Sequence, residues 1–154
     1  MQVRHHATIL MIAGVLAAVS LALAAALAVT NYIPRADPDI SEFSNRAVSY
    51  NGTYTIYYKS ELDPIVANRE HKWTLHIEKK GAGLALDFAR VFVSGFTVPD
   101  SHPLPAQPRV TRMLGNGNYL MEGVKFDRPG EWVLYFYTVF GSDYDTVEVH
   151  VLVK

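Results

Sequence analysis

Two hydrophobic patterns divide the chain. From Ala7 to Val29 apolar residues follow one another and no residue is charged. A helix needs about 20 such residues to cross the hydrocarbon core of a bilayer. From Ala47 to Lys154 apolar and polar residues instead alternate with a period of two, which is the period of a β-strand. The pattern predicts a cytoplasmic tail at 1–6, a transmembrane helix at 7–30, a juxtamembrane linker at 31–46 and a β-domain at 47–154.

The apolar N-terminal run has an alternative interpretation as a cleaved signal peptide. Such a peptide has an apolar region of about 7–15 residues before a small-x-small cleavage site. Ala26-Leu27-Ala28 fits that site, but the run is longer than this, so its length favours an uncleaved anchor. A short tail, a span and then a folded domain predict a cytoplasmic N-terminus and a domain on the far side of the membrane.

Small residues recur at every fourth position of the predicted span, at Gly14, Ala18, Ala22 and Ala26. Small side chains at this spacing let helix backbones approach closely in lipid. They predict that the span packs against the helix of an integral membrane partner. The alternative is an alanine-rich span that packs on nothing specific.

The β-domain contains about seven short strand patterns, separated by turn residues, and no amphipathic helix. Asn51-Gly52 and Gly115-Asn116-Gly117-Asn118 are hairpin signals, because asparagine and glycine tolerate positive φ. Short strands with regular turns predict an all-β fold, specifically an immunoglobulin-like antiparallel β-sandwich of about seven strands.

The middle of the domain contains an alternating stretch followed by a proline-rich one. Residues 84–93 alternate as one strand, which places Leu86, Phe88 and Phe92 on the same face. Residues 95–108 are rich in proline, which has no N–H to donate to a β-ladder. We therefore expect a strand that ends at Val93, followed by a loop.

Composition excludes several classes of function. The chain has 14 Lys and Arg against 15 Asp and Glu, and this net charge of −1 argues against a nucleic-acid binder, which needs a concentrated basic face. It has no cysteine, which excludes disulfides, thiolate nucleophiles and thiolate metal ligands. There is no G-x-S-x-G motif, and the acidic residues are scattered among turns without forming an acid–base pair. We expect a protein that is not an enzyme.

Residues 62–78 (LDPIVANREHKWTLHIE), residues 102–126 and the motif Arg128-Pro129-Gly130-Glu131-Trp132 resemble the YtkA-like domain family. The resemblance implies an immunoglobulin-like sandwich in the periplasm, anchored to the inner membrane of a bacterium. The similar FixH family consists of membrane-anchored proteins linked to the assembly of cbb3-type cytochrome oxidase. The resemblance thus implies an accessory or assembly subunit of a larger membrane complex, of a respiratory or electron-transfer kind.

The same resemblance raises the question of copper. Family members often carry a Met-Pro-x-His-x-His-Gly loop, of which residues 98–103 here keep a single histidine, His102. Thioether and imidazole groups are good copper ligands, so His102, Met113 and Met121 are the candidate metal ligands. The alternative role of the two methionines is to fill the core. No other cofactor is expected.

Aromatic residues are concentrated towards the C-terminus, at Trp132, Tyr135, Tyr137, Phe140 and Tyr144. They are more than one small core needs, and aromatic side chains are common anchors of protein interfaces. They predict a partner-binding surface, although a second face that packs the opposing sheet or lies near the membrane is the alternative. We therefore expect a non-catalytic accessory subunit that binds integral membrane proteins, with a copper-handling domain centred on His102 as the other possibility.

The predicted topology can be tested with a fusion of alkaline phosphatase to the C-terminus. The enzyme is active only outside the cytoplasm, so the fusion is expected to be active in cells. A fusion that lacks residues 1–30 should be inactive, and an inactive full-length fusion would contradict the predicted orientation.

Overall fold

The computed structural model describes residues 40–98 and 100–154. The predicted tail, the transmembrane helix with its Gly14, Ala18, Ala22 and Ala26 face, and the linker up to residue 39 lie outside the described residues. Within the described part the helical structure is a single 3-10 turn, η1 (Ile40–Glu42), and no helix there is long and apolar enough to span a bilayer.

The described residues form an all-β fold in which every strand pairing is antiparallel, as the alternating pattern predicts. The sheet runs in the order β1-β2-β3-β7-β6-β5-β8-β9, and the short β4 pairs with β3. The described residues form nine strands where about seven were expected. One predicted strand, over residues 84–93, is broken in two, and the first strand begins at Asn45, inside the predicted linker. The strands are β1 (Asn45–Val48), β2 (Tyr54–Ser60), β3 (His71–Lys79), β4 (Leu84–Ala85), β5 (Arg90–Val98), β6 (Arg109–Gly115), β7 (Asn118–Val124), β8 (Gly130–Phe140) and β9 (Asp143–Val153).

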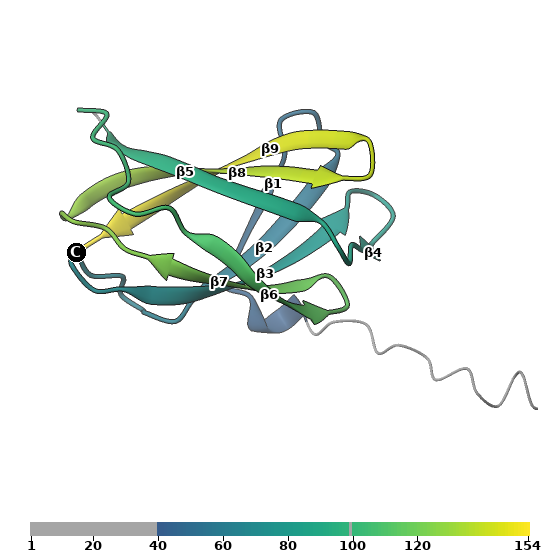
Figure 1. Ribbon diagram of the computed structural model, residues 1–154, viewed down its shortest axis with the longest axis horizontal. Helices are drawn as coiled ribbons and strands as arrows, with labels where there is room; N and C mark the ends of the chain where they lie inside the picture. The colour runs from purple at the N-terminus through teal and green to yellow at the C-terminus, as the bar shows by residue number, and fades with distance from the viewer. Residues whose placement is uncertain (1–39, 99) are drawn as a thin grey trace, which may run out of the picture. The chain divides into compact units, whose positions relative to one another are not determined.

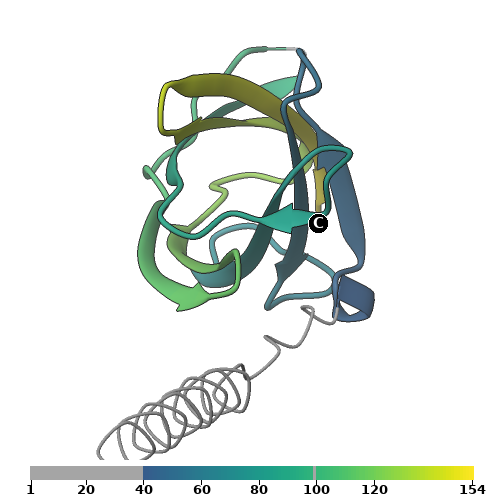
Figure 2. The same cartoon turned by 90° about the vertical axis from the view of Figure 1, so that its right-hand side faces the viewer.

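The sheet curls until its two ends meet, so the domain is nearly a closed barrel (Figure 1 and Figure 2). The group β1-β2-β3-β7-β6 faces the group β5-β8-β9. In the described structure the ladder between β5 and β6 consists of the pair Phe92 and Arg109. At the opposite margin the Tyr50 N–H donates to the Thr146 carbonyl at 2.9 Å, which joins the end of β1 to β9.

The core lies between these two groups and is dominated by aromatic rings and valines. The indoles of Trp73 and Trp132 are both fully buried, and each N–H has an acceptor, His71 Nε2 at 2.9 Å and the Arg128 carbonyl at 3.2 Å. Buried polar groups are costly unless they are hydrogen-bonded. The period of two predicted for the β-domain is confirmed in β9, where every second residue from position 147 is a buried valine. We call this set the valine stripe: Val147, Val149, Val151 and Val153.

The predicted hairpin at residues 115–118 is confirmed. Asn116 and Gly117 both have positive φ, at 53° and 71°, as a two-residue turn of type I′ requires. A Cβ on Gly117 would lie 2.8 Å from the Ile77 carbonyl oxygen, so a larger residue does not fit there.

The prediction of one strand over residues 84–93 is wrong. β4 ends at Ala85, Phe88 has a φ of 68°, and β5 begins at Arg90 and continues to Val98. Long-range contacts cause the break: Asp87 Oδ1 accepts the Gly117 N–H at 2.8 Å. The break changes which side chains point inward, so Leu86 is buried while Phe88 and Phe92 are exposed.

The proline-rich stretch covers the open edge of β5. The Leu104 N–H donates to the Gly95 carbonyl at 2.9 Å, and the Thr97 N–H donates to the His102 carbonyl at 2.9 Å. Pro103 forms an isolated bridge with Phe96. Because proline has no N–H to offer, this stretch ends the ladder and blocks the addition of another strand.

The segment before β1 packs on the outer side of β2 and β3 rather than continuing as linker. The Phe43 ring lies 6.5 Å from the Tyr57 ring and 6.0 Å from the His76 ring. His76, which follows the outward-facing pattern of its strand, is fully buried beneath them. Its ring nitrogens contact Asn118 Oδ1 at 3.0 Å and Glu78 Oε1 at 3.2 Å.

A buried carboxylate, Asp145, fastens β9 to the turn between β1 and β2. It accepts hydrogen bonds from the Asn51 N–H, the Asn51 side-chain amide at 3.1 Å and the Thr53 N–H at 3.2 Å. Burial alone would raise the pKa of Asp145, but bonds from the Ser49 side chain and three backbone amides outweigh it and hold this pKa well below its usual range. The ionised form is therefore the one that stabilises the fold.

Replacing Asp145 with alanine leaves these donors without their acceptor. We expect a loss of about 2–3 kcal/mol in the free energy of unfolding, the usual size for hydrogen bonds to a charged group. Thermal and denaturant unfolding of the full chain in mild detergent measure it. Asp143→Ala is the matched control, since its exposed ion pair with Lys79 should contribute about 0.5 kcal/mol or less.

The same comparison has a predictable pH dependence. An unfolded aspartate ionises near pH 4, about 3.9, so the contribution of Asp145 is complete at neutral pH. This contribution is lost as the pH falls from about 4 towards the lower pKa that Asp145 has in the folded state. The difference between the parent chain and Asp145→Ala should shrink in acid, and equal stabilities at pH 7 would contradict the role given to this carboxylate.

Candidate functional site

His102 lies in the loop between β5 and β6, and both nitrogens of its ring are already engaged. The Arg128 guanidinium, which can only donate, contacts Nδ1 at 3.2 Å, so Nδ1 accepts. The other nitrogen, Nε2, then carries the proton and donates to Asp127 Oδ2 at 2.7 Å. A metal ion would have to displace one of these partners.

The contacts of His102 belong to a wider polar network, the His102 network, formed by Thr97, Asp100, His102, Asp127 and Arg128. Arg128 Nη1 donates to Asp100 Oδ2 at 3.2 Å, and the His102 N–H donates to the Thr97 hydroxyl at 3.0 Å. Asp100 also accepts from the Thr97 hydroxyl. The network ties the loop to β5 and to the turn before β8.

The charges in this network support one another. The hydrogen bond from His102 holds the pKa of the Asp127 carboxyl below its usual range. The hydrogen bond from Thr97 does the same for the pKa of Asp100. Both carboxylates are therefore ionised at neutral pH. Their hydrogen bonds hold the loop against β5 and the turn before β8, and we call this restraint the latch.

The structure does not bring the three predicted copper ligands together. Met121 is fully buried in the core, where it pairs with Trp73. The Met113 sulfur accepts the Phe88 N–H at 3.2 Å, just before β5 begins, whereas His102 contacts Thr97 near the end of β5. The seven residue-to-residue steps from Arg90 to Thr97 span about 23 Å at ~3.3 Å per step. The described residues also contain no group of three or more His, Cys, Asp or Glu suited to a metal ion.

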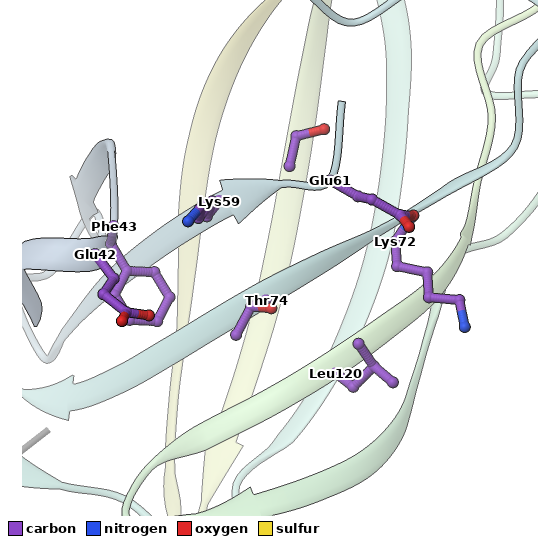
Figure 3. A pocket seen from close by; sticks show the side chains of 8 residues that line it. Glu42, Phe43, Lys59, Glu61, Lys72, Thr74 and Leu120 are labelled. Atoms are coloured by element: carbon purple, nitrogen blue, oxygen red, sulfur yellow. The ribbon is translucent and has the colours of Figure 1, made fainter. Parts of the chain in front are cut away.

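A shallow pocket of about 330 Å³ lies on the outer side of β2, β3 and β7 (Figure 3). Leu120, Thr74 and Phe43 line it, together with the charged residues Lys59 and Lys72. Lys72 Nζ forms an ion pair with Glu122 Oε1 at 2.8 Å. The pocket offers a mixed polar and apolar surface and no arrangement of nucleophile and base.

The larger feature is the outer side of the group β5-β8-β9. Tyr135 and Tyr137 alternate along β8 with the buried Leu134 and Phe136, so they point outward. The register brings further aromatic residues beside them from the neighbouring strands, since Phe92 pairs with Tyr137. We call this surface the aromatic face; it comprises Phe92, Phe96, Tyr135, Tyr137 and Tyr144.

Three rings of the aromatic face lie in contact: the Phe96 and Tyr135 rings are 5.8 Å apart, and the Tyr135 and Tyr137 rings are 6.4 Å apart. These three residues are half-buried, whereas Phe92 is 59% exposed and Tyr144 is 60% exposed. Partly exposed aromatic rings gathered on one surface are typical of a binding surface.

Two of the five residues predicted for partner binding lie elsewhere. Trp132 is fully buried, with its ring 5.2 Å from Phe126, and Phe140 packs against the core. Conversely, Phe92 and Phe96 were missed. They lie on this surface because of the residues with which they align on β8. The sequence pattern predicts one unbroken strand over residues 84–93, and the break at Phe88 changes which side of β5 faces outward.

A charged cluster lies at one side of the aromatic face, on β9. His150 is held between Glu131 Oε1 at 2.9 Å and Glu148 Oε1 at 2.9 Å. Hydrogen bonds to Glu131 and then to Glu148 raise the pKa of His150. Glu148 also accepts the Tyr50 hydroxyl, and that bond lowers the pKa of the carboxyl. Because both ring nitrogens contact carboxylates, the imidazolium form fits this position.

Comparison of the chain with protein-family models, curated proteins and solved structures gave no match.

The latch role of the His102 network can be tested by hydrogen exchange. His102→Ala removes the bonds to Asp127 and Arg128, for which we expect a local cost of about 1 kcal/mol because the site is partly exposed. That cost corresponds to about fivefold faster exchange of the Leu104 and Thr97 amides. His150→Ala, in the charged cluster beside the aromatic face, is the control. Equal exchange rates of these amides in the two variants would count against the latch.

Proposed function

We propose that this protein is a non-catalytic, membrane-anchored accessory or assembly subunit that binds protein partners through the aromatic face and its predicted transmembrane helix. The observation that carries the proposal is the aromatic face itself. It gathers five partly or largely exposed aromatic residues on the outer side of three paired strands, and three of their rings are in contact.

The chemistry of this face suits a protein partner. Tyrosine and phenylalanine provide large apolar contact areas with few rotatable bonds, and such residues dominate the binding energy of protein interfaces. The tyrosine hydroxyls add polar contacts, such as the bond of 3.2 Å from Ser94 to Tyr137. The charged cluster around His150 supplies a polar rim of the kind that surrounds an apolar interface.

The arrangement of strands supports an immunoglobulin-like sandwich as the finer description of the fold. The order β2-β3-β7-β6 corresponds to strands A-B-E-D of that fold, and β5-β8-β9 corresponds to C-F-G. With the resemblance to the YtkA-like family, this leads us to propose a periplasmic domain on the inner membrane of a bacterium. The partner would then be an integral membrane complex of a respiratory kind, by similarity to the FixH proteins.

A non-catalytic role agrees with the polar groups of the described residues. Both ring nitrogens of His102 and of His150 are engaged by neighbouring charged groups, and neither cluster contains a nucleophile beside a free base. This supports a binding role for the domain.

The proposal can be tested by affinity purification from native membranes in mild detergent. The double variant Tyr135→Ala and Tyr137→Ala removes the centre of the aromatic face. Interface hot spots of this kind each contribute about 2 kcal/mol, so recovery of the partner should fall about tenfold or more. Both side chains point outward, so the fold should persist, as circular dichroism can verify.

Phe88→Ala is the matched control, because Phe88 is also an exposed aromatic residue but lies outside the aromatic face. It should leave recovery of the partner unchanged. The same proteins recovered with the double variant, in the same amount, would contradict the proposed function.

A further inference from the structure

A second exposed apolar cluster lies at one end of the domain, away from the aromatic face. It consists of Leu84 in β4, Phe88 before β5, and Met113 and Leu114 at the end of β6, and we call it the apolar tip. All four side chains are exposed, and Phe88 is 79% exposed. Figure 1 places β4 and the turn between β6 and β7 at the same end of the domain, and Figure 2 looks onto that end.

We infer that the apolar tip inserts into the headgroup region of the lipid bilayer to which the chain is anchored. The inference goes beyond the proposed function, because it assigns a different surface and a lipid rather than a protein.

Hydrogen bonds hold the backbone of the tip around Phe88 in place, so its exposed apolar side chains do not belong to an unpacked loop. The Tyr119 hydroxyl donates to the Leu86 carbonyl and accepts the Ala89 N–H at 2.9 Å, so it clamps the loop on both sides of Phe88. Asp87 binds the turn at Gly117. Within this frame Phe88 has a positive φ, which is unfavourable for a bulky residue. Strain of this kind persists where the surrounding structure fixes it and is concentrated at functional positions.

Positive charge surrounds the tip. Lys79 pairs with Leu84 in the ladder between β3 and β4, Lys80 follows it, and both are exposed. Arg90 and Arg112, also exposed, lie two positions after Phe88 and one before Met113. Lys79 is paired with Asp143, which leaves Lys80, Arg90 and Arg112 as the exposed cations close to the tip in the sequence. Apolar side chains beside lysine and arginine are typical of surfaces that lie in a membrane interface and attract anionic headgroups.

The length of the chain outside the described structure favours the bilayer over other apolar occupants. The uncharged run ends at Val29 and the described chain begins at Ile40. Ten residues between them reach at most about 35 Å, at ~3.5 Å per residue. A domain of this size is about as wide as that reach. A chain that crosses the membrane at 7–30 therefore holds the start of its domain within about 35 Å of the lipid surface, which allows one end of the domain to touch that surface.

The absence of cysteine allows the inference to be tested with a single label on the full chain. Leu84→Cys places an NBD fluorophore in the tip and keeps Phe88. Glu70→Cys provides the control, because it lies before β3 and Leu84 pairs with the last residue of β3. The two positions are separated by nine strand residues, about 30 Å at ~3.3 Å each. Both proteins are reconstituted into vesicles of phosphatidylcholine and phosphatidylglycerol that contain doxyl-labelled lipid.

We expect the label at position 84 to be quenched at least twofold more than the label at position 70 and to emit at shorter wavelength. Phe88→Asp, added to Leu84→Cys, should bring the quenching down to the level of position 70. Lys80→Ser with Arg112→Ser should reduce it in vesicles with phosphatidylglycerol and change it little in pure phosphatidylcholine.

Equal quenching at positions 84 and 70 would overturn the inference, and so would quenching that Phe88→Asp leaves unchanged. In another outcome, the label at position 84 is shielded only when proteins from native membranes are added and not in protein-free vesicles. That result would assign the tip to a protein partner and would also overturn the inference. The proposed function is tested separately, because these vesicles contain no partner. Tyr135→Ala with Tyr137→Ala should leave the quenching unchanged whatever its effect on co-purification.

Discussion

The buried carboxylate of Asp145 holds together the two ends of a sheet that would otherwise remain open. Its acceptor oxygens are used by the turn between β1 and β2, which belongs to the other end of the strand order. The bond helps to keep the sheet closed around its apolar side, which the alternating pattern of each strand defines. The inner side receives the valines of β9 and the two tryptophans, and the outer side of β5, β8 and β9 receives the aromatic face. The surface assigned to partner binding thus depends on an interaction made some distance from it.

Closure also determines how a partner can bind. At one margin β1 is joined to β9, and at the other the proline-rich stretch lies along β5 and is fixed by the His102 network. Neither place offers a free ladder of N–H and carbonyl groups, so adding a strand from another protein is unfavourable there. The proposed partner would therefore have to bind side chains on the faces of the sheet, among which the aromatic face is the proposed site.

The sequence alone predicted features that depend on neighbours in the chain. The valine stripe of β9 and the turn at Asn116 and Gly117 are examples, because a period of two and a demand for positive φ are local properties. The errors concern residues whose position is decided by distant contacts. Phe88 faces outward because Asp87 and Ala89 bind the hairpin of β6 and β7. Trp132 faces the core because its β8 register is set by neighbouring strands, and His102 is committed to Asp127 and Arg128, which no spacing in the sequence reveals.

The packing of Phe43 against Tyr57 and His76 has a consequence for the kinetics of assembly. It extends the packed domain back to Phe43, three residues before the predicted boundary at residue 46. If the chain is anchored as proposed, the shorter tether would confine the aromatic face to a smaller volume above the membrane. For a partner in the same bilayer this raises the effective concentration of the binding surface, which reaches the millimolar range for short flexible linkers. A contact that would be weak between two freely diffusing proteins can therefore be occupied most of the time between two tethered ones.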